Sequence, residues 1–147
     1  SKSTPAYIRK SEIFKKDFIP LLMVLMKDLD NLSDLETWTG LTEENDNDLE
    51  EMHYAAREGV ELLAIDLGAK FFLDLVNPFI SKFFMSNDWL EVHAAFVSIA
   101  WLAETCSKQF KGDLENLLNF ISHGLQHENP RVRHSSLSAL GMLCSSN

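Results

Sequence analysis

Five histidines and two cysteines are the residues of this 147-residue chain whose types suit metal or thiol chemistry. His123 and His127 stand four residues apart and would share one face of a helix, as pairs of zinc ligands do. The HExxH sequence is absent, and no third ligand stands at a recognised spacing. We therefore expect both histidines to be polar residues near an exposed helix end, with no metal and no other cofactor.

Cys106 and Cys144 fall at positions that the helical pattern assigns to the core side of their helices. Neither has a histidine or a cation at a spacing that implies activation, so we expect two small buried hydrophobic residues. Two cysteines make no disulfide framework and favour a reducing intracellular compartment. Carboxylates are plentiful but gather in one segment, whereas acid–base catalysis needs them rigidly held. No phosphate-binding loop or nucleophile motif is present, so we predict that the chain is not an enzyme.

The acidic residues that produce the net charge of −9 lie in a single segment. Residues 28–56 hold ten acids and no Lys or Arg, while the rest of the chain has twelve acids and thirteen bases. A basic protein partner is therefore plausible, and a solvated loop that only keeps the chain soluble is the equal alternative. Direct nucleic-acid binding needs a basic face and is not expected. No apolar run reaches the roughly 18 residues that a membrane span requires, so no membrane association is expected.

Helical patterns must position these residues, and they repeat along the chain. When His93 is aligned with His134, Phe96 falls on Leu137, and residues 79–81 (Phe-Ile-Ser) fall on residues 120–122 (Phe-Ile-Ser). Pairs of helical patterns that repeat every 40–47 residues or so indicate HEAT or armadillo arrays. Pro20 matches Pro78 in the same way but at a longer spacing. The first repeat therefore contains an insertion, which coincides with the acidic segment.

These observations predict an all-α fold, an α-solenoid of three HEAT repeats with six main helices in antiparallel pairs. The repeats span about 15–68, 71–108 and 113–145, with an acidic loop at about 30–48 in the first. Within that loop, Trp38 and Leu41 either pin it to the helices or are exposed for a partner. The second helices are expected at about 49–67, 89–108 and 131–144. The outer faces near Phe18 and along 137–144 would lack neighbours and favour weak self-association.

Turn chemistry supports the boundaries between these helices. Asp88 is a good N-cap, and Glu91 three residues later completes a pair similar to a capping box. Asp113 is the N-cap expected for the next helix, and Pro130 suits a first helical turn.

One helix of the second repeat carries a tryptophan on its polar side. Trp101 lies about 200° from Ile99 around a helix, so it points away from the core that Ile99 joins. An outward tryptophan is either a binding anchor or a residue that packs on a neighbouring repeat. The equivalent stripe of the first repeat contains Glu58, Glu61, Ile65 and Asp66. Acidic and aromatic side chains therefore meet on a predicted inner surface.

Several motifs, in their order along the chain, resemble the karyopherin-β (importin-β) nuclear transport receptors, most closely the importin-five type. The resemblance covers nearly the whole chain. The motifs are Asn87-Asp88-Trp89, Asn129-Pro130-Arg131-Val132-Arg133, Pro20-Leu21-Leu22, Pro78-Phe79-Ile80, Asp66-Leu67-Gly68-Ala69-Lys70 and the acidic insert. The resemblance makes Asp88, Trp89, Pro130 and Arg133 structural residues of the repeat loops. The family usually has an arginine where this chain has Val92, which puts a polar ladder between repeats in doubt there.

The resemblance implies an interior fragment of a long HEAT solenoid that binds proteins and shuttles between cytoplasm and nucleus. The family binds cargo on its inner surface, releases it to the GTP-bound GTPase Ran, and contacts FG nucleoporins. Cargo of this chain is expected to be basic. The candidate cargo or Ran contacts are Glu43, Glu44, Asp46, Asp48, Glu58, Glu61, Asp66 and Trp101. A HEAT scaffold subunit of a multiprotein complex is the alternative function, and a metalloenzyme bundle is a third.

Overall fold

The computed structural model describes residues 11, 14–31 and 43–146, without the side chains of residues 14–15, 28–31, 43–50 and 52–53. The part of the predicted acidic loop from residue 32 to 42, with Trp38 and Leu41, lies outside the described residues. The elements are η1 (Phe14–Phe18, a π-helical turn), α2 (Ile19–Asn31), α4 (Glu43–Leu67), α5 (Ala69–Phe84), α6 (Trp89–Leu102), α7 (Ser107–Gly112), α8 (Leu114–Leu125) and α9 (Pro130–Ser145).

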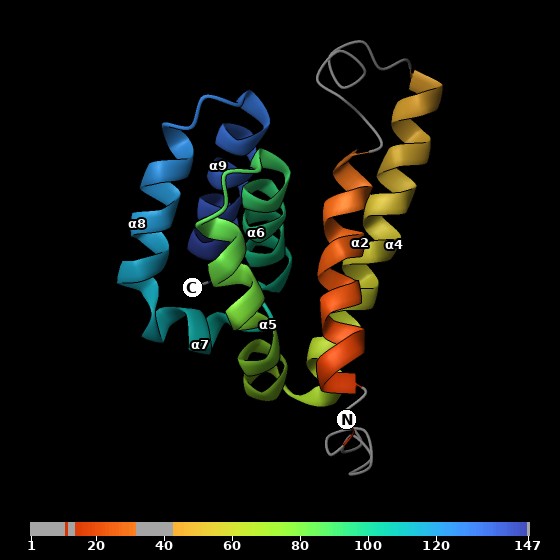
Figure 1. Cartoon of the computed structure of the whole chain (residues 1–147), viewed down its shortest axis with the longest axis vertical. Helices are drawn as coiled ribbons and strands as arrows, with labels where there is room; N and C mark the ends of the chain where they lie inside the picture. The colour runs from red at the N-terminus through yellow and green to blue at the C-terminus, as the bar shows by residue number, and fades with distance from the viewer. Residues whose placement is uncertain (1–10, 12–13, 32–42, 147) are drawn as a thin grey trace.

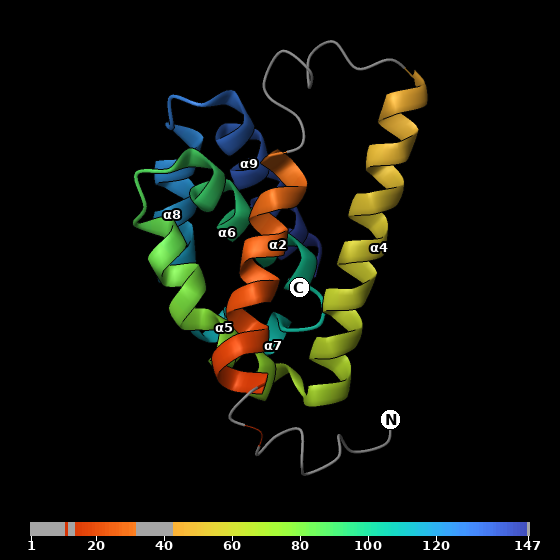
Figure 2. The same ribbon diagram turned by 45° about the vertical axis from the view of Figure 1, so that its right-hand side comes forward.

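The helices form three antiparallel hairpins, α2–α4, α5–α6 and α8–α9, that follow one another across the molecule (Figure 1). Turned by 45°, the same array shows the N-terminal part of α4 extending beyond the other helices (Figure 2). The prediction of an all-α solenoid is confirmed. Gly68 joins the first two hairpins with φ of 93°, a backbone conformation that glycine adopts without steric cost. None of the helices in the described residues is long and apolar enough to cross a membrane.

The acidic loop was predicted to reach residue 48, and this boundary is wrong. Helix α4 begins at Glu43, so residues 43–48 form its first turns. Glutamate is a good helix former, and acidic residues at a helix N-terminus interact favourably with the helix dipole. The apolar pattern that starts near Leu49 therefore marks where the helix meets the core and not where it begins.

The second helix of the second hairpin is shorter than predicted. Helix α6 ends at Leu102, and a turn at residues 103–106 leads into the separate short helix α7. The backbone N–H of Cys106 still donates to the carbonyl of Leu102 at 2.8 Å. The change in direction lets both Cys106 and Phe110 reach the core, where each is buried. Tertiary packing therefore overrides the continuous helical pattern.

The two turns that link the helices of the second and third hairpins share one hydrogen-bond plan. The Asp88 carboxylate accepts from the N–H of Leu90 at 3.0 Å, and the Asn129 side chain accepts from the N–H of Arg131 at 2.9 Å. Both turn residues also donate their own N–H at 3.0 Å, Asp88 to the Ser86 hydroxyl and Asn129 to Nδ1 of His127. The paired residues correspond in the alignment of His93 with His134, so the turns confirm that alignment.

Two predicted details of capping differ. Glu91 does not complete a capping box through the N–H of Asp88, because it accepts from the Ser86 hydroxyl at 3.2 Å. Asp113 occupies the N-cap position of α8, but its carboxylate accepts from the side-chain amide of Asn116 at 2.9 Å and not from a backbone N–H. In both turns a neighbouring polar side chain competes for the bond that the capping rule assigns to the backbone.

The seam between the second and third hairpins is packed closely around Phe96, which is buried. The ring of Phe84 lies edge-on to that of Phe96, with centroids 4.9 Å apart, and stacks on that of Phe120 at 4.4 Å. A Cβ atom on Gly124 would stand 2.5 Å from the Phe96 ring and 2.7 Å from Cβ of Ser136. The ring fits against α8 only because residue 124 has no side chain.

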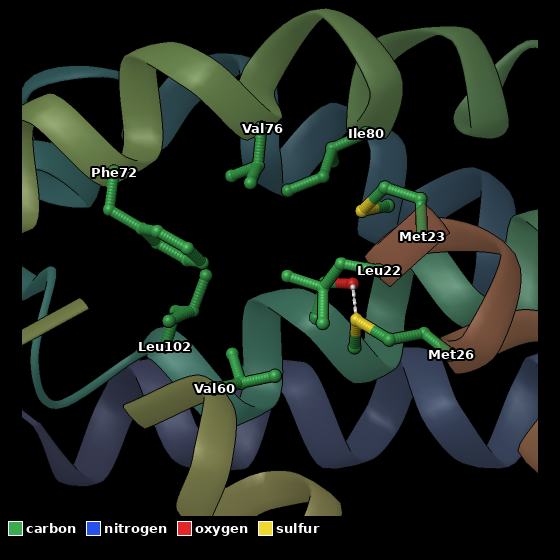
Figure 3. Close-up of a pocket in the computed structure, with 9 residues that line it drawn as sticks. Leu22, Met23, Met26, Val60, Phe72, Val76, Ile80 and Leu102 are labelled. Carbon is green, nitrogen blue, oxygen red and sulfur yellow. Dashed lines mark hydrogen bonds between the residues drawn. The ribbon is translucent and has the colours of Figure 1, made fainter. Parts of the chain in front are cut away.

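The seam between the first and second hairpins is looser. Figure 3 shows its small apolar cavity, of about 10 Å³, with side chains from α2, α4, α5 and α6 around it. Two methionines line it, and the hydroxyl of Ser98 lies 3.5 Å from the sulfur of Met26 and 2.7 Å from the carbonyl oxygen of Ala94. Methionine fills irregular space with a flexible chain, which fits a seam of lower density.

Each seam is also joined by a contact at the inter-helix turns. Lys27, in the C-terminal half of α2, forms an ion pair of 2.7 Å with Asp88. The hydrogen bond from Lys27 holds the pKa of Asp88 below its ordinary value of 3.8; partial burial opposes this shift, and the Leu90 N–H adds to it. At the next seam the guanidinium of Arg131 lies 5.5 Å from the ring centroid of Trp89, a cation–π geometry.

The two cysteines lie in different environments. Cys106 is buried as predicted, with its sulfur 4.0 Å from the carbonyl oxygen of Ala69, and burial raises the pKa of its thiol to about 11. Cys144 is exposed, so the prediction for it is wrong. It lies on the side of α9 that carries the exposed Leu137 and Gly141.

Candidate protein-binding surface

One face of α4 forms an open hollow of about 360 Å³. Because residues three and four apart share a helix face, side chains from about three turns contribute to it. The hollow is lined by Tyr54, Arg57, Glu58, Glu61, Leu62 and Ile65. Its three large apolar or aromatic members, Tyr54, Leu62 and Ile65, are all at least half exposed. We call these six residues the α4 groove.

The polar residues of the α4 groove are arranged so that one carboxylate stays available. Arg57 donates from Nε to Glu61 Oε1 at 2.7 Å, one helical turn away, and this pair is only partly exposed. Glu58 is exposed beside the pair. The groove therefore offers apolar contact area together with a negative group, which suits a ligand that carries an apolar side chain next to a cation.

The structure brings together some of the predicted contact residues and separates others. Glu58 and Glu61 share the groove, whereas Asp66 is exposed but does not line it. The backbone of residues 43–48 lies in the N-terminal turns of α4, on the same helix as the groove. The side chains of Glu43, Glu44, Asp46 and Asp48 are outside the described part of the chain.

Trp101 is half-buried and packs against the hydrophobic core. The alternative in which it packs within the array therefore accounts for its position, and it does not line the α4 groove. The outward stripe of α6 is covered in part because three hairpins bury more than one face of a central helix.

The predicted loop residues all lie in the two inter-helix turns or beside them. Asp88 caps α6, Trp89 lies under Arg131, and Pro130 is the first residue of α9. Arg133 donates from Nη1 to the carbonyl oxygens of His127 and Glu128 at 2.7 and 3.0 Å, so these bonds stay within its own repeat. Val92, at the matching place, is buried. The seams are joined instead by the Lys27–Asp88 ion pair and by the contact of Arg131 with Trp89.

The histidine pair shows no sign of a metal site in this geometry. Nδ1 of His127 accepts a hydrogen bond from the N–H of Asn129, which uses the lone pair that a ligand would need. Among the side chains that the structure describes, no group of three His, Cys, Asp or Glu residues is placed to hold a metal ion.

Sequence reasoning missed three members of the groove, Tyr54, Arg57 and Leu62. The signal was present, since positions 54, 58, 61 and 65 follow the spacing of one helix face. Alignment with the polar stripe of α6 selects Glu58, Glu61, Ile65 and Asp66 and does not include the residues on either side of them. A complete listing of apolar residues outside the core stripe of α4 would have found Tyr54 and Leu62.

Comparison with known protein families agrees with this architecture. The importin-repeat family model matches residues 1–74, half of the chain, and this range includes α2, α4 and the α4 groove. The HEAT-repeat model matches residues 117–146, which cover most of the α8–α9 hairpin. The chain therefore belongs to the importin-repeat family, as a HEAT-repeat protein of the importin (karyopherin) type.

Proposed function

We propose that this chain is a protein-binding segment of a nuclear import receptor of the importin-five-like branch. In this proposal it carries basic cargo through the nuclear pore, contacts FG nucleoporins there, and is controlled by the GTPase Ran. It shuttles between cytoplasm and nucleus, and its action is binding without catalysis.

The α4 groove is the observation that carries the proposal. It lies within the residues that match the importin repeat and exposes apolar side chains beside Glu58. Helix α4 holds nine acidic residues and one arginine over residues 43–67. A helix of such charge raises the rate at which a basic segment associates, and salt weakens this effect beyond roughly 8–10 Å. The groove then supplies apolar contact at short range.

A binding experiment with a matched control tests the role of the acidic turns. The probe is a fluorescent peptide of five lysine or arginine residues around one leucine, and its affinity is measured by anisotropy at low and moderate salt. The test variant converts Glu43, Glu44, Asp46 and Asp48 to their amides. We expect roughly tenfold weaker binding at low salt and a flatter salt dependence.

The control variant removes the same number of negative charges from outside α4, by converting the exposed acids Glu104, Asp113, Glu115 and Glu128 to amides. It should bind nearly as well as the unmodified chain. Equal losses in both variants, or no loss in either, would favour a solubilising role for the acidic segment. Ran loaded with GTP should displace the peptide, whereas Ran loaded with GDP should not. If neither form of Ran displaced the peptide, the alternative function of a HEAT scaffold subunit would be favoured.

A further inference from the structure

The α4 groove contains the single lysine or arginine of its helix. Residues 43–67 include nine acids, and Arg57 is the one arginine among them. Its side chain lines the groove and donates from Nε to Oε1 of Glu61 at 2.7 Å. The groove has two carboxylates, Glu58 and Glu61, so its own arginine already occupies one of them.

The face of α4 that carries the groove stays partly open in the central hairpin too. Three core positions of α4 have the same spacing as three positions in α6 and the turn after it, and all six are buried: Val60, Ala64 and Leu67, and Ile99, Ala103 and Cys106. This register matches Glu58 and Leu62 of the groove to Val97 and Trp101. Both are only partly buried, although α6 has a hairpin on either side (Figure 1). Stacking of hairpins therefore leaves this face accessible.

A second ion pair of the same spacing shows what is particular to the groove. Lys70 on α5 donates from Nζ to Oδ2 of Asp74 at 3.0 Å, and these side chains are 80% and 64% exposed. The side chains of Arg57 and Glu61 are 39% and 32% exposed. Because partial exclusion of water strengthens an interaction between charges, the Arg57–Glu61 pair holds its partners more firmly than the solvated pair. An incoming cation must compete with it.

We propose that Arg57 is a built-in competitor, which holds through Glu61 the position that a ligand arginine takes on binding. The ligand is a segment that carries an arginine beside an apolar residue, because a guanidinium matches the carboxylate that Arg57 releases and Leu62 and Ile65 offer apolar contact. This inference rests on the proposed function of the α4 groove and deepens it. Arg57 limits the affinity for basic segments in general, so a segment without the apolar residue is held weakly.

Two variants with equal net charge test the competition. The probe is a fluorescent peptide of five arginines around one leucine, and anisotropy at low salt gives its affinity. Arg57→Gln frees Glu61 and should bind the peptide about fivefold more tightly than the unmodified chain. Lys70→Gln is the matched control, because it also removes one cation from a pair of residues four apart, but outside the groove. Its affinity should rise by less than about twofold.

A double variant separates competition for Glu61 from simple repulsion between Arg57 and the ligand. Glu61→Gln should weaken binding, and adding Arg57→Gln to it should change the affinity by less than about twofold, because no carboxylate is left to be freed. In the nitrogen-15-labelled chain, the NMR signal of the Arg57 Nε–H should move during peptide titration toward its position in Glu61→Gln. Circular dichroism should show the same helix content in all variants.

The possible results distinguish this inference from the proposed function. If the chain binds the peptide but Arg57→Gln binds no more tightly than Lys70→Gln, or gains equally in the Glu61→Gln background, the competitor role is overturned and the proposed function stands. If the expected gain is found but GTP-bound Ran does not displace the peptide, the competitor role stands and control by Ran does not. If neither the unmodified chain nor Arg57→Gln binds the peptide, both are overturned.

Discussion

Gly124 lies where the ring of Phe96 touches α8, so a single methyl group there tests the packing of the seam. In Gly124→Ala the new Cβ would stand 2.5 Å from the ring and 2.7 Å from the Ser136 side chain. The atoms must shift, and overpacking of this kind costs about 1–3 kcal/mol of unfolding free energy. Urea titration followed by circular dichroism measures the loss, with midpoints compared first because repeat arrays need not unfold in two states.

Gly141→Ala provides the control for this substitution. No atom lies within 4 Å of the Cβ position at Gly141, and the residue is in the interior of α9. Alanine there should be neutral or should stabilise by up to about 1 kcal/mol. Adding Phe96→Leu to Gly124→Ala should recover part of the loss, because the smaller side chain makes room. Equal midpoints for Gly124→Ala and Gly141→Ala would show that the close approach does not hold in solution.

The two cysteines should differ strongly in reactivity toward alkylating reagents. The nucleophile is the thiolate, and the raised pKa of Cys106, about 11, leaves little of it at pH 8. Burial also shields that sulfur, whereas Cys144 is exposed. Mass spectrometry after a brief iodoacetamide treatment should find one modified cysteine, Cys144, in the native chain and two in urea. Modification of Cys106 at a similar rate in the native chain would contradict its buried position.

At the scale of the helices, the ion pair between Lys27 and Asp88 ties α2 to the turn before α6. Because the pKa of Asp88 is lower in the folded state than its ordinary 3.8, its charge stabilises the fold above that pH. The stabilisation disappears as the pH falls through the lower, folded-state value. Both side chains are partly exposed, so we expect less than about 1 kcal/mol.

Asp88→Asn separates this charge from the capping role, since asparagine is also a favoured N-cap. The variant should be slightly less stable than the unmodified chain at pH 7 and should lose less stability between pH 5 and pH 3. Thermal unfolding at both pH values gives the comparison. The reference variant is Asp113→Asn, which removes an exposed carboxylate whose described hydrogen bond comes from the Asn116 amide and not from a cation. Identical pH profiles for Asp88→Asn and the unmodified chain would argue against the ion pair.

The helices show where sequence reasoning succeeds. The alignment of the second and third repeats located two turns whose hydrogen bonds match, even though Ser86 is replaced by His127 and Asp88 by Asn129. It succeeds because the turn needs acceptor atoms at fixed places and several residue types supply them. The start of α4 at Glu43 was missed because charged residues without an apolar periodicity are common to loops and exposed helix ends.

The remaining errors have tertiary causes. A helix pattern through residues 103–106 gives no sign of the break, because the change in direction places Cys106 and Phe110 in a core made by other helices. The prediction placed Cys144 on the core side of its helix, but a helix pattern alone does not decide which side of α9 other helices cover, and Cys144 shares the exposed side with Leu137. The α4 groove was found only in part, because its residues lie beside the core stripe and their exposure depends on how α2 and α6 cover α4.

For the molecule as a whole, the contrast between the two seams has a consequence for volume. The cavity of about 10 Å³ beside Met23 and Met26 is space that water occupies once the seam opens, so the opened state has the smaller total volume. Hydrostatic pressure should therefore separate the first hairpin before the third. High-pressure NMR should show methyl signals of Met23, Met26 and Val60 changing at lower pressure than those of Ile121 and Leu143. Val60→Ile, which adds a methylene beside the void, should reduce this difference in pressure between the two groups of signals. If all these signals changed together, the void would have no influence on which end of the array yields first.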